Sequence, residues 1–206
     1  MRHGHFQDLT AGHGKRERTR SALLDAAVEV VAEKGVEAAK ISDITTAAGL
    51  ANGTFYNHFN DKDEILREAA YGIAFEVARR LDEEMEGIED AAIRVVTATT
   101  RFVSILTGER DWAAVLLGGA DRLPDFREDF YRYLRSDLER GVAQGKFDVE
   151  ITTFLIDQVV ALIAVAIRAQ LQTAPDPRLT REVCGSILRL LGMTPAKAEK
   201  AIAAAA

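Results

Sequence analysis

Cysteine is nearly absent from the sequence: Cys184 is the single one among 206 residues. One cysteine excludes an intramolecular disulfide and any metal site built from several thiolates. The first ten residues also lack the apolar segment that marks a secretory signal. Both absences fit a reducing compartment, so we expect a cytoplasmic protein that needs no metal or other cofactor.

Proline and strand-like patterns are scarce as well. Only four prolines occur, alternating β-branched runs are missing, and Ala, Leu, Glu and Arg are abundant. This composition predicts an all-α fold. The longest unbroken apolar run, from Val159 to Ile167, has nine residues. A membrane span needs about 20, so we expect this run to be buried in protein and the chain to have no membrane partner.

The acidic charge is unevenly distributed. The net charge is −6, but residues 1–62 carry eight basic and eight acidic side chains, whereas the remainder carries 18 basic and 24 acidic ones. A less acidic N-terminal part is compatible with contact to nucleic-acid phosphates.

Breaks in helical periodicity predict the domain organisation. We expect a flexible tail over 1–17, a DNA-binding domain over 18–62, a helical domain over 63–193 and an Ala-rich tail over 194–206, which forms a weak helix or stays frayed. Gly35 is expected to end the first helix, and a long helix is expected from about Lys62 to Glu86. The larger domain should contain helices near 90–107, 111–119, 124–144, 149–172 and 178–191.

The stretch from Ile41 to Phe59 predicts two short helices joined by a tight turn. Gly49 can adopt the left-handed backbone that the turn requires, Ser42 is the expected N-cap of the first helix, and the second should run from about Asn52 to Phe59. Helices this short are marginal alone, so we expect a small core of Ile44, Ala47, Ala48, Leu50, Phe55 and Phe59. The pattern is typical of a helix-turn-helix, which presents its second helix to a major groove.

The second helix of this motif carries a polar surface with little charge. Hydroxyl and ring N–H groups can donate hydrogen bonds to phosphates, an amide can address a base edge, and Gly53 leaves room for a phosphate near the backbone. The expected DNA-binding residues are Ser42, Asn52, Gly53, Thr54, Tyr56, Asn57, His58 and Lys62. For the preceding cluster of Lys15, Arg16, Arg18 and Arg20, a solvated helix start and a DNA-contacting arm both remain open.

The string from Ile44 to Leu66 resembles the tetracycline-repressor (TetR) family of regulators. It has Ala-Gly at 48–49, Gly-Thr-Phe-Tyr at 53–56, His-Phe at 58–59, and Lys62 four positions before Leu66. The resemblance is specific over roughly 18–68 and only architectural beyond.

The resemblance implies roles for individual residues. Tyr56, His58 and Lys62 would contact phosphates with help from Ser42, while Thr54 and Asn57 would face bases or backbone. Ala51 departs from the Ser or Thr usual in the family. We therefore expect no side-chain cap on the recognition helix, unless Asn52 supplies one; losing such a cap costs about 1 kcal/mol.

The larger domain is expected to dimerise and to bind an effector. Helix 149–172 is apolar nearly all round, so one face should pack inward and another against a second copy. The resemblance implies that this helix and 178–191 form the dimer interface; the expected residues are Phe154, Val159, Ile163, Ile167, Val183, Ile187, Leu190 and Leu191. A structural core is the default interpretation of the middle helices, but the family implies a cavity there. Its expected lining is Phe102, Trp112, Leu116, Phe126, Phe130, Tyr131 and Arg168.

These features predict a sequence-specific regulator of transcription. A homodimer would bind palindromic double-stranded DNA, and an unknown, apolar or aromatic small molecule would release it. Repression is the commoner outcome in the family. A ligand-independent architectural DNA-binding protein is the nearest alternative, and a helical adaptor that binds only protein is another.

An enzyme is not expected. The segment from Gly141 to Lys146 is one residue short of a phosphate-binding loop, and no Gly-x-Ser-x-Gly or His-Glu-x-x-His motif occurs. His3, His5 and His13 match no defined metal site.

Overall fold

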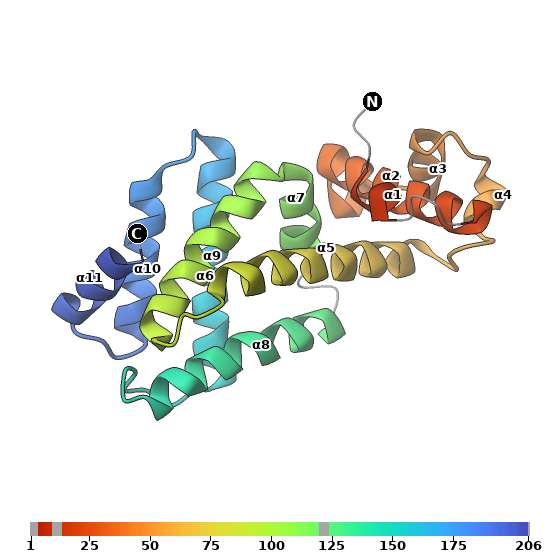
Figure 1. Ribbon diagram of the computed structural model, residues 1–206. Coiled ribbons are helices and arrows are strands. Elements are labelled where there is room, and N and C mark those ends of the chain that lie inside the picture. Colours follow the sequence, from red (N-terminus) through yellow and green to blue (C-terminus); the bar gives the residue numbers. More distant parts are fainter. Residues whose placement is uncertain (1–3, 10–13, 120–123, 206) are drawn as a thin grey trace. The chain divides into compact units, whose positions relative to one another are not determined.

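A computed structural model describes residues 4–9, 14–119 and 124–205, with the side chains of Leu9, Asp82, Gly119 and residues 124–130 outside the description. Every regular element in this part of the chain is a helix (Figure 1), which confirms the all-α prediction. The helices are α1 His5–Leu9, α2 Lys15–Ala38, α3 Ile41–Ala47, α4 Asn52–Phe55, α5 Lys62–Met85, α6 Ala91–Gly108, α7 Arg110–Gly119, α8 Pro124–Ala143, α9 Thr153–Gln172, α10 Pro177–Leu190 and α11 Pro195–Ala204.

The chain forms two compact units. The first comprises Met1–Glu76 and Arg110–Phe126, and the second comprises Val77–Glu109 and Arg127–Ala206. Helix α7 packs on α2 inside the first unit, although the sequence placed residues 111–119 in the larger domain. The first unit therefore extends past the expected boundary at residue 62 and recruits a helix from a distant part of the chain.

Helix α2 packs against α1, α3 and α7 within the first unit. Its apolar positions, among them Leu23, Ala27 and Val31, are almost fully buried. Gly35 has φ 79° and interrupts the helical geometry, as the sequence predicted for that residue. Only glycine adopts this conformation without steric cost, so the chain can change direction there before α3 begins.

The N-terminal segment is not merely a tail. Helix α1 packs on α2, and the Asp25 carboxylate of α2 accepts hydrogen bonds from the backbone N–H groups of Phe6 and Gln7, both at 3.0 Å. Phe6 is buried, and a Cβ placed on Gly72 of α5 would lie 2.3 Å from its ring. The prediction of a flexible tail over 1–17 is therefore wrong for residues 5–9, and α2 already begins at residue 15. His3 and His13 lie outside the described residues.

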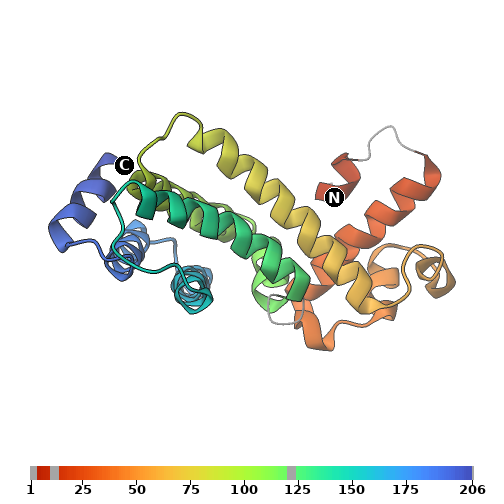
Figure 2. The same ribbon diagram turned by 90° about the horizontal axis from the view of Figure 1, so that it is seen from below.

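In the second unit, α6, α9, α10 and α11 pack on one another, and α9 and α10 are seen nearly end-on beside each other in Figure 2. The fully buried side chains include Leu106, Leu138, Ile156, Ile167, Ile187 and Leu188. Asp90, Thr152, Asp176 and Thr194 cap the starts of the four helices. The Ala-rich C-terminal segment forms α11, where Ala198 and Ile202 are buried, so of the two expected outcomes the helical one is observed.

Helix α9 is longer and more apolar than its unbroken run suggested. The helix has 20 residues, and its most apolar 18-residue window has a mean hydropathy of 1.8 and is 39% buried in the protein. By length and composition alone this helix could cross a membrane, so counting an unbroken run of nine residues was too strict a test. Its buried residues include Ile156, Ile163 and Ile167, and it packs on α6 and α10, as expected of a core helix.

Candidate nucleic-acid interface

Residues 41–59 form the predicted helix-turn-helix. Helix α3 leads into a turn in which Gly49 has φ 67°, as predicted, and α4 follows. The α-helical part of α4 ends at Phe55, earlier than the expected Phe59. The chain nevertheless keeps a helical course, because the N–H groups of His58 and Phe59 donate to the Phe55 carbonyl at 2.9 and 3.0 Å. We call residues 52–59 the recognition segment.

A small aromatic core lies beneath the recognition segment. Ile44 and Phe55 are fully buried and Phe59 is 1% exposed, while the ring centroids of Phe55 and Phe59 are 5.7 Å apart. These side chains are core residues, as predicted, and they hold two helices that would be unstable in isolation.

Polar side chains lie on the outer side of the same segment. Tyr56 is 61% exposed, Asn52, Gly53 and Asn57 are also exposed, and Thr54 is half-buried. A Cβ placed on Gly53 would meet nothing within 4 Å. The structure therefore presents most of the expected DNA-binding groups on one short stretch of chain, where donors and an amide can meet phosphates and base edges.

The start of α4 lacks a side-chain cap, as predicted from Ala51. Asn52 does not replace the cap, because its Oδ1 accepts a hydrogen bond from the Thr45 hydroxyl. Thr45 is buried in α3, so this bond holds α3 and α4 together. Part of the Asn52 side chain is thus engaged inside the motif.

Ser42 is not the N-cap that the sequence predicted. Helix α3 begins at Ile41, with Lys40 at the cap position. The Asp43 carboxylate accepts the Lys40 backbone N–H at 3.2 Å and pairs with Lys34 at 2.9 Å, and Lys34 lowers the pKa of Asp43. Ser42 is exposed on the first turn of α3, and its predicted phosphate contact stays a prediction.

Lys62 has partners that the sequence did not suggest. Its Nζ lies 3.1 Å from the carbonyl oxygens of Val36 and Ala39 and 3.4 Å from that of Glu37. An ammonium group has three N–H donors, and these carbonyls end α2, where a cation is favoured. In this structure Lys62 joins the end of α2 to the start of α5, and its predicted phosphate contact stays a prediction.

His58 lies between the exposed face and the core. Its Nδ1 is buried without a hydrogen-bond partner. Burial, followed by the nearby positive charges of Arg16 and Arg20, lowers the pKa of the ring. The ring is therefore neutral near pH 7 and carries a single N–H donor.

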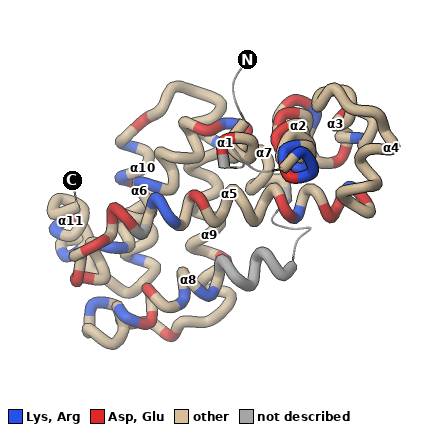
Figure 3. Tube along the Cα trace, turned by 45° about the vertical axis from the view of Figure 1, so that its right-hand side comes forward, with Lys and Arg blue, Asp and Glu red and all other residues tan. Residues whose placement is uncertain are grey.

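Basic residues gather at the start of α2 (Figure 3), and their side chains are of two kinds. Lys15, Arg16 and Arg18 are exposed. Arg20 instead pairs with Glu68 of α5, with two N–O distances of 2.5 and 2.6 Å. The exposed three remain candidates for a DNA-contacting arm, and that contact stays a prediction.

The residues expected to line an effector pocket are divided between the two units. Trp112 and Leu116 are buried in the first unit. Phe102, Tyr131 and Arg168 belong to the second, where Arg168 is exposed on α9. The Tyr131 hydroxyl donates to Asp157 at 2.5 Å. The side chains of Phe126 and Phe130 lie outside the described residues.

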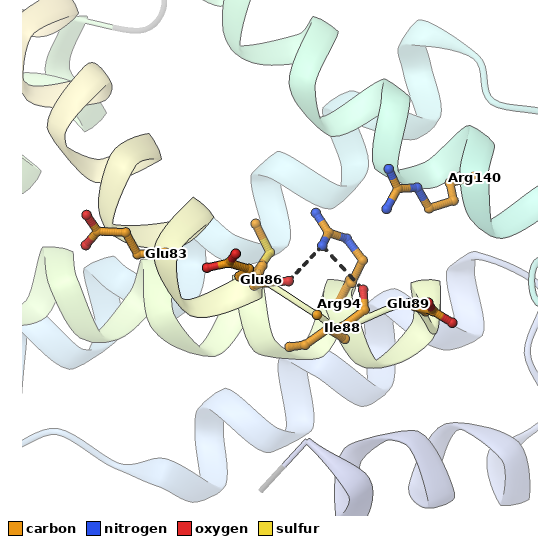
Figure 4. A pocket seen from close by; sticks show the side chains of 8 residues that line it. Glu83, Glu86, Ile88, Glu89, Arg94 and Arg140 are labelled. Atoms are coloured by element: carbon orange, nitrogen blue, oxygen red, sulfur yellow. Dashed lines mark hydrogen bonds between the residues drawn. The ribbon is translucent and has the colours of Figure 1, made fainter.

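A surface hollow lies where α5 meets α6 (Figure 4), lined by Glu83, Met85, Glu86, Gly87, Ile88, Glu89, Arg94 and Arg140. Of the predicted pocket residues whose side chains the structure describes, none lines this hollow. Arg94 donates to the carbonyls of Met85 and Ile88 at 3.0 and 3.4 Å and to Asp137 at 3.4 Å. Because Arg94 makes these hydrogen bonds, it stabilises the connection between α5 and α6, and its N–H donors are engaged within the protein.

Most of the expected dimer residues are placed in the core of the chain itself. Val159, Ile163, Ile167, Val183, Ile187 and Leu191 are buried, Leu190 is half-buried and Phe154 is 71% exposed. The sequence missed Val165, which is 59% exposed on the same helix. On this helix Phe154, Ala161 and Val165 are all exposed, at spacings of seven and four residues that place them on one side.

Comparison with known proteins supports the interpretation of residues 41–59 as a helix-turn-helix. Residues 23–69 match the family model described as bacterial regulatory proteins, tetR family. The chain is 31% identical over 146 residues to the fatty acid metabolism regulator protein of Bacillus subtilis (strain 168), covering 67% of this chain and 75% of that protein. It is 28% identical to the transcriptional repressor KstR2 of Rhodococcus jostii (strain RHA1), covering 70% and 74%.

A solved structure of similar fold is that of RolR in complex with the ligand resorcinol. The two chains are 26% identical with a TM-score of 0.72, over 91% of this chain and 94% of RolR. The helix-turn-helix geometry, the similar regulators and the shared architecture all indicate the same family. The chain belongs to the tetR family of bacterial regulatory proteins and is a helix-turn-helix regulator of transcription.

Proposed function

We propose that the protein is a homodimeric repressor that binds a palindromic operator through its two recognition segments and releases it when a small apolar or aromatic molecule binds. The observation that carries the proposal is the two-sided recognition segment, which has a buried aromatic side and an exposed polar side. Tyr56 is largely exposed, whereas its neighbour Phe55 is fully buried.

Residue chemistry supports a division of labour on this surface. Tyr56, Thr54 and His58 carry donors suited to phosphate oxygens, and such contacts set the register of a protein on the duplex. The Asn57 amide carries a donor and an acceptor side by side, which suits the major-groove edge of adenine. We therefore assign positioning to the first three residues and sequence reading to Asn57.

The exposed stripe on α9 supports the dimer. Phe154 and Val165 are large apolar side chains that α9 leaves uncovered while its opposite side packs on α6 and α10. A two-fold axis beside this stripe would bury both copies of each residue. Two recognition segments in such a dimer would reach half-sites about one helical turn, roughly 34–36 Å, apart.

The effector class is inferred from aromatic residues of the larger domain and from similarity to known regulators. Phe102 and Tyr131 of the second unit are aromatic, and the similar protein RolR binds resorcinol. The relationship to a regulator of fatty acid metabolism makes a long acyl chain the other apolar candidate. A regulator of this kind acts on chromosomal DNA, so we expect it in the bacterial cytoplasm.

The test is selection from a pool of random duplex DNA by the purified protein, followed by sequencing. Enrichment of one palindrome supports a sequence-specific dimer, whereas uniform, salt-sensitive retention would indicate an architectural binder. Resorcinol and a long-chain acyl-CoA are then titrated into the complex with the selected duplex. Release by one of them identifies the effector class, and release by neither contradicts the proposed classes.

A further inference from the structure

Arg20 belongs to the basic cluster by sequence but not by geometry. Its guanidinium forms two parallel contacts to the Glu68 carboxylate, at 2.5 and 2.6 Å. The same group lies over the ring of Phe59, with Cζ 4.4 Å from the ring centroid. One guanidinium is thus paired with a carboxylate through two of its nitrogens and also lies over an aromatic ring, an arrangement for which Arg is suited and Lys is not.

Phe59 connects this arrangement to the DNA-facing residues. It is the last residue of the recognition segment and is 1% exposed. Its ring lies 5.7 Å from that of Phe55, and the Phe55 ring lies 5.4 Å from that of Tyr56. A continuous row of neighbouring side chains therefore runs from Glu68 through Arg20, Phe59 and Phe55 to the exposed Tyr56.

We propose that Arg20 is a positioning residue for DNA recognition, which holds the recognition segment in place through Phe59 and does not itself contact phosphate. The inference rests on the proposed function, because it takes Tyr56 and Asn57 to be DNA contacts. Its chemical basis is that the Arg20 guanidinium is already committed inside the protein. A phosphate contact would require it to leave both Glu68 and the Phe59 ring.

The environment of Glu68 is consistent with this role. The carboxylate is half-buried, and burial raises its pKa while Arg20 opposes that effect. Removing Arg20 would leave a partly buried carboxylate without its main partner, and Phe59 without the group that covers it.

A positioning residue and a residue that binds phosphate differ in their salt dependence. Each phosphate that the protein no longer neutralises reduces the magnitude of the slope of log K against log salt by about 0.9. Loss of positioning weakens binding without changing the number of phosphates neutralised. Arg16 is the matched control, because it is an exposed arginine at the start of the same helix.

The experiment compares the variants Arg20→Lys, Arg20→Met, Glu68→Gln and Arg16→Met. Affinity for the selected duplex is measured across a salt range. Hydrogen exchange of residues 52–59 is measured in the free protein, where DNA plays no part. We expect Arg20→Lys and Glu68→Gln to bind about tenfold more weakly with an unchanged slope, and to exchange faster over 52–59. Arg16→Met should exchange like the wild type.

Opposite results would overturn the proposal. If Arg20→Lys binds as well as the wild type and Arg20→Met reduces the slope by about 0.9, Arg20 binds phosphate directly. Unchanged exchange over 52–59 in both Arg20→Lys and Glu68→Gln would equally contradict positioning. If Arg20→Met does not fold, Arg20→Lys and Glu68→Gln still test whether Arg20 positions the recognition segment. If the wild type retains no duplex, the proposed function fails, while the exchange measurement still decides whether Arg20 holds the segment.

Discussion

Among single residues, the basic side chains of the DNA-binding unit look alike in sequence but differ in their surroundings. Lys62 and Arg20 are turned onto protein partners, whereas Lys15, Arg16 and Arg18 remain exposed. The presence of a Lys or Arg in the sequence shows only that its side chain is chemically able to contact a phosphate. Whether it does depends on which carbonyls and carboxylates the fold brings within reach.

Lys62→Met should destabilise the protein by about 1–2 kcal/mol, because three carbonyls at the end of α2 lose a charged donor. Urea unfolding measures the change. Lys40→Met is the control, since Lys40 is an exposed lysine at the start of α3, and it should change stability by less than about 0.5 kcal/mol. Equal effects of the two variants would show that the hydrogen bonds of Lys62 contribute nothing specific.

The lowered pKa of His58 predicts a pH dependence of stability. Because the folded state favours the neutral ring, it binds fewer protons than the unfolded chain, whose histidines titrate near pH 6.5. The contribution is therefore present above that pH and is lost as the pH falls through the lower folded value. Urea midpoints between pH 7.5 and 5 should fall more steeply for the wild type than for His58→Asn. Parallel curves would contradict the assignment.

At the scale of elements, short helices depend on what they pack against. Helix α1 has five residues, too few to be stable alone, and it persists because Asp25 accepts its first N–H groups while Phe6 packs against Gly72 of α5. The close approach requires that α5 carry no side chain at residue 72.

Gly72→Ala should therefore destabilise the wild type, because the new Cβ would lie 2.3 Å from the Phe6 ring. In a Phe6→Ala background the same change should stabilise the protein by up to about 1 kcal/mol, the helix propensity gained over glycine. Urea unfolding of the four proteins completes the cycle. The same sign of effect in both backgrounds would exclude this packing of Phe6 on Gly72.

For the molecule as a whole, the proposed binding to a palindrome requires two copies. The exposed stripe of Phe154, Ala161 and Val165 is the surface along which we expect α9 to meet another α9. Burying a carboxylate there without a partner is costly, so one substitution is enough to test the interface.

Val165→Asp should convert the dimer to a monomer in sedimentation velocity and should abolish high-affinity binding to the selected duplex. Val142→Asp on α8 is the control, because Val142 is an exposed valine outside the stripe, and it should leave the dimer intact. A dimeric Val165→Asp protein would place the interface elsewhere.

The helical fold, the turn at Gly49, the missing cap at Ala51 and the buried role of Phe55 and Phe59 could all be predicted from the amino acids alone. These features depend on local propensity and periodicity, which neighbouring residues encode. Contacts between distant residues were needed to show that α7 packs on α2, that α1 docks, that Lys62 and Arg20 have protein partners, and that six of the expected dimer residues are buried in the core. Each of these outcomes depends on residues tens of positions apart meeting in space, and on an apolar helix choosing which of its faces to bury. The spacing of Phe154, Ala161 and Val165 was present in the sequence, but apolar residues also occupy other faces of α9, so periodicity alone did not select the face that stays exposed.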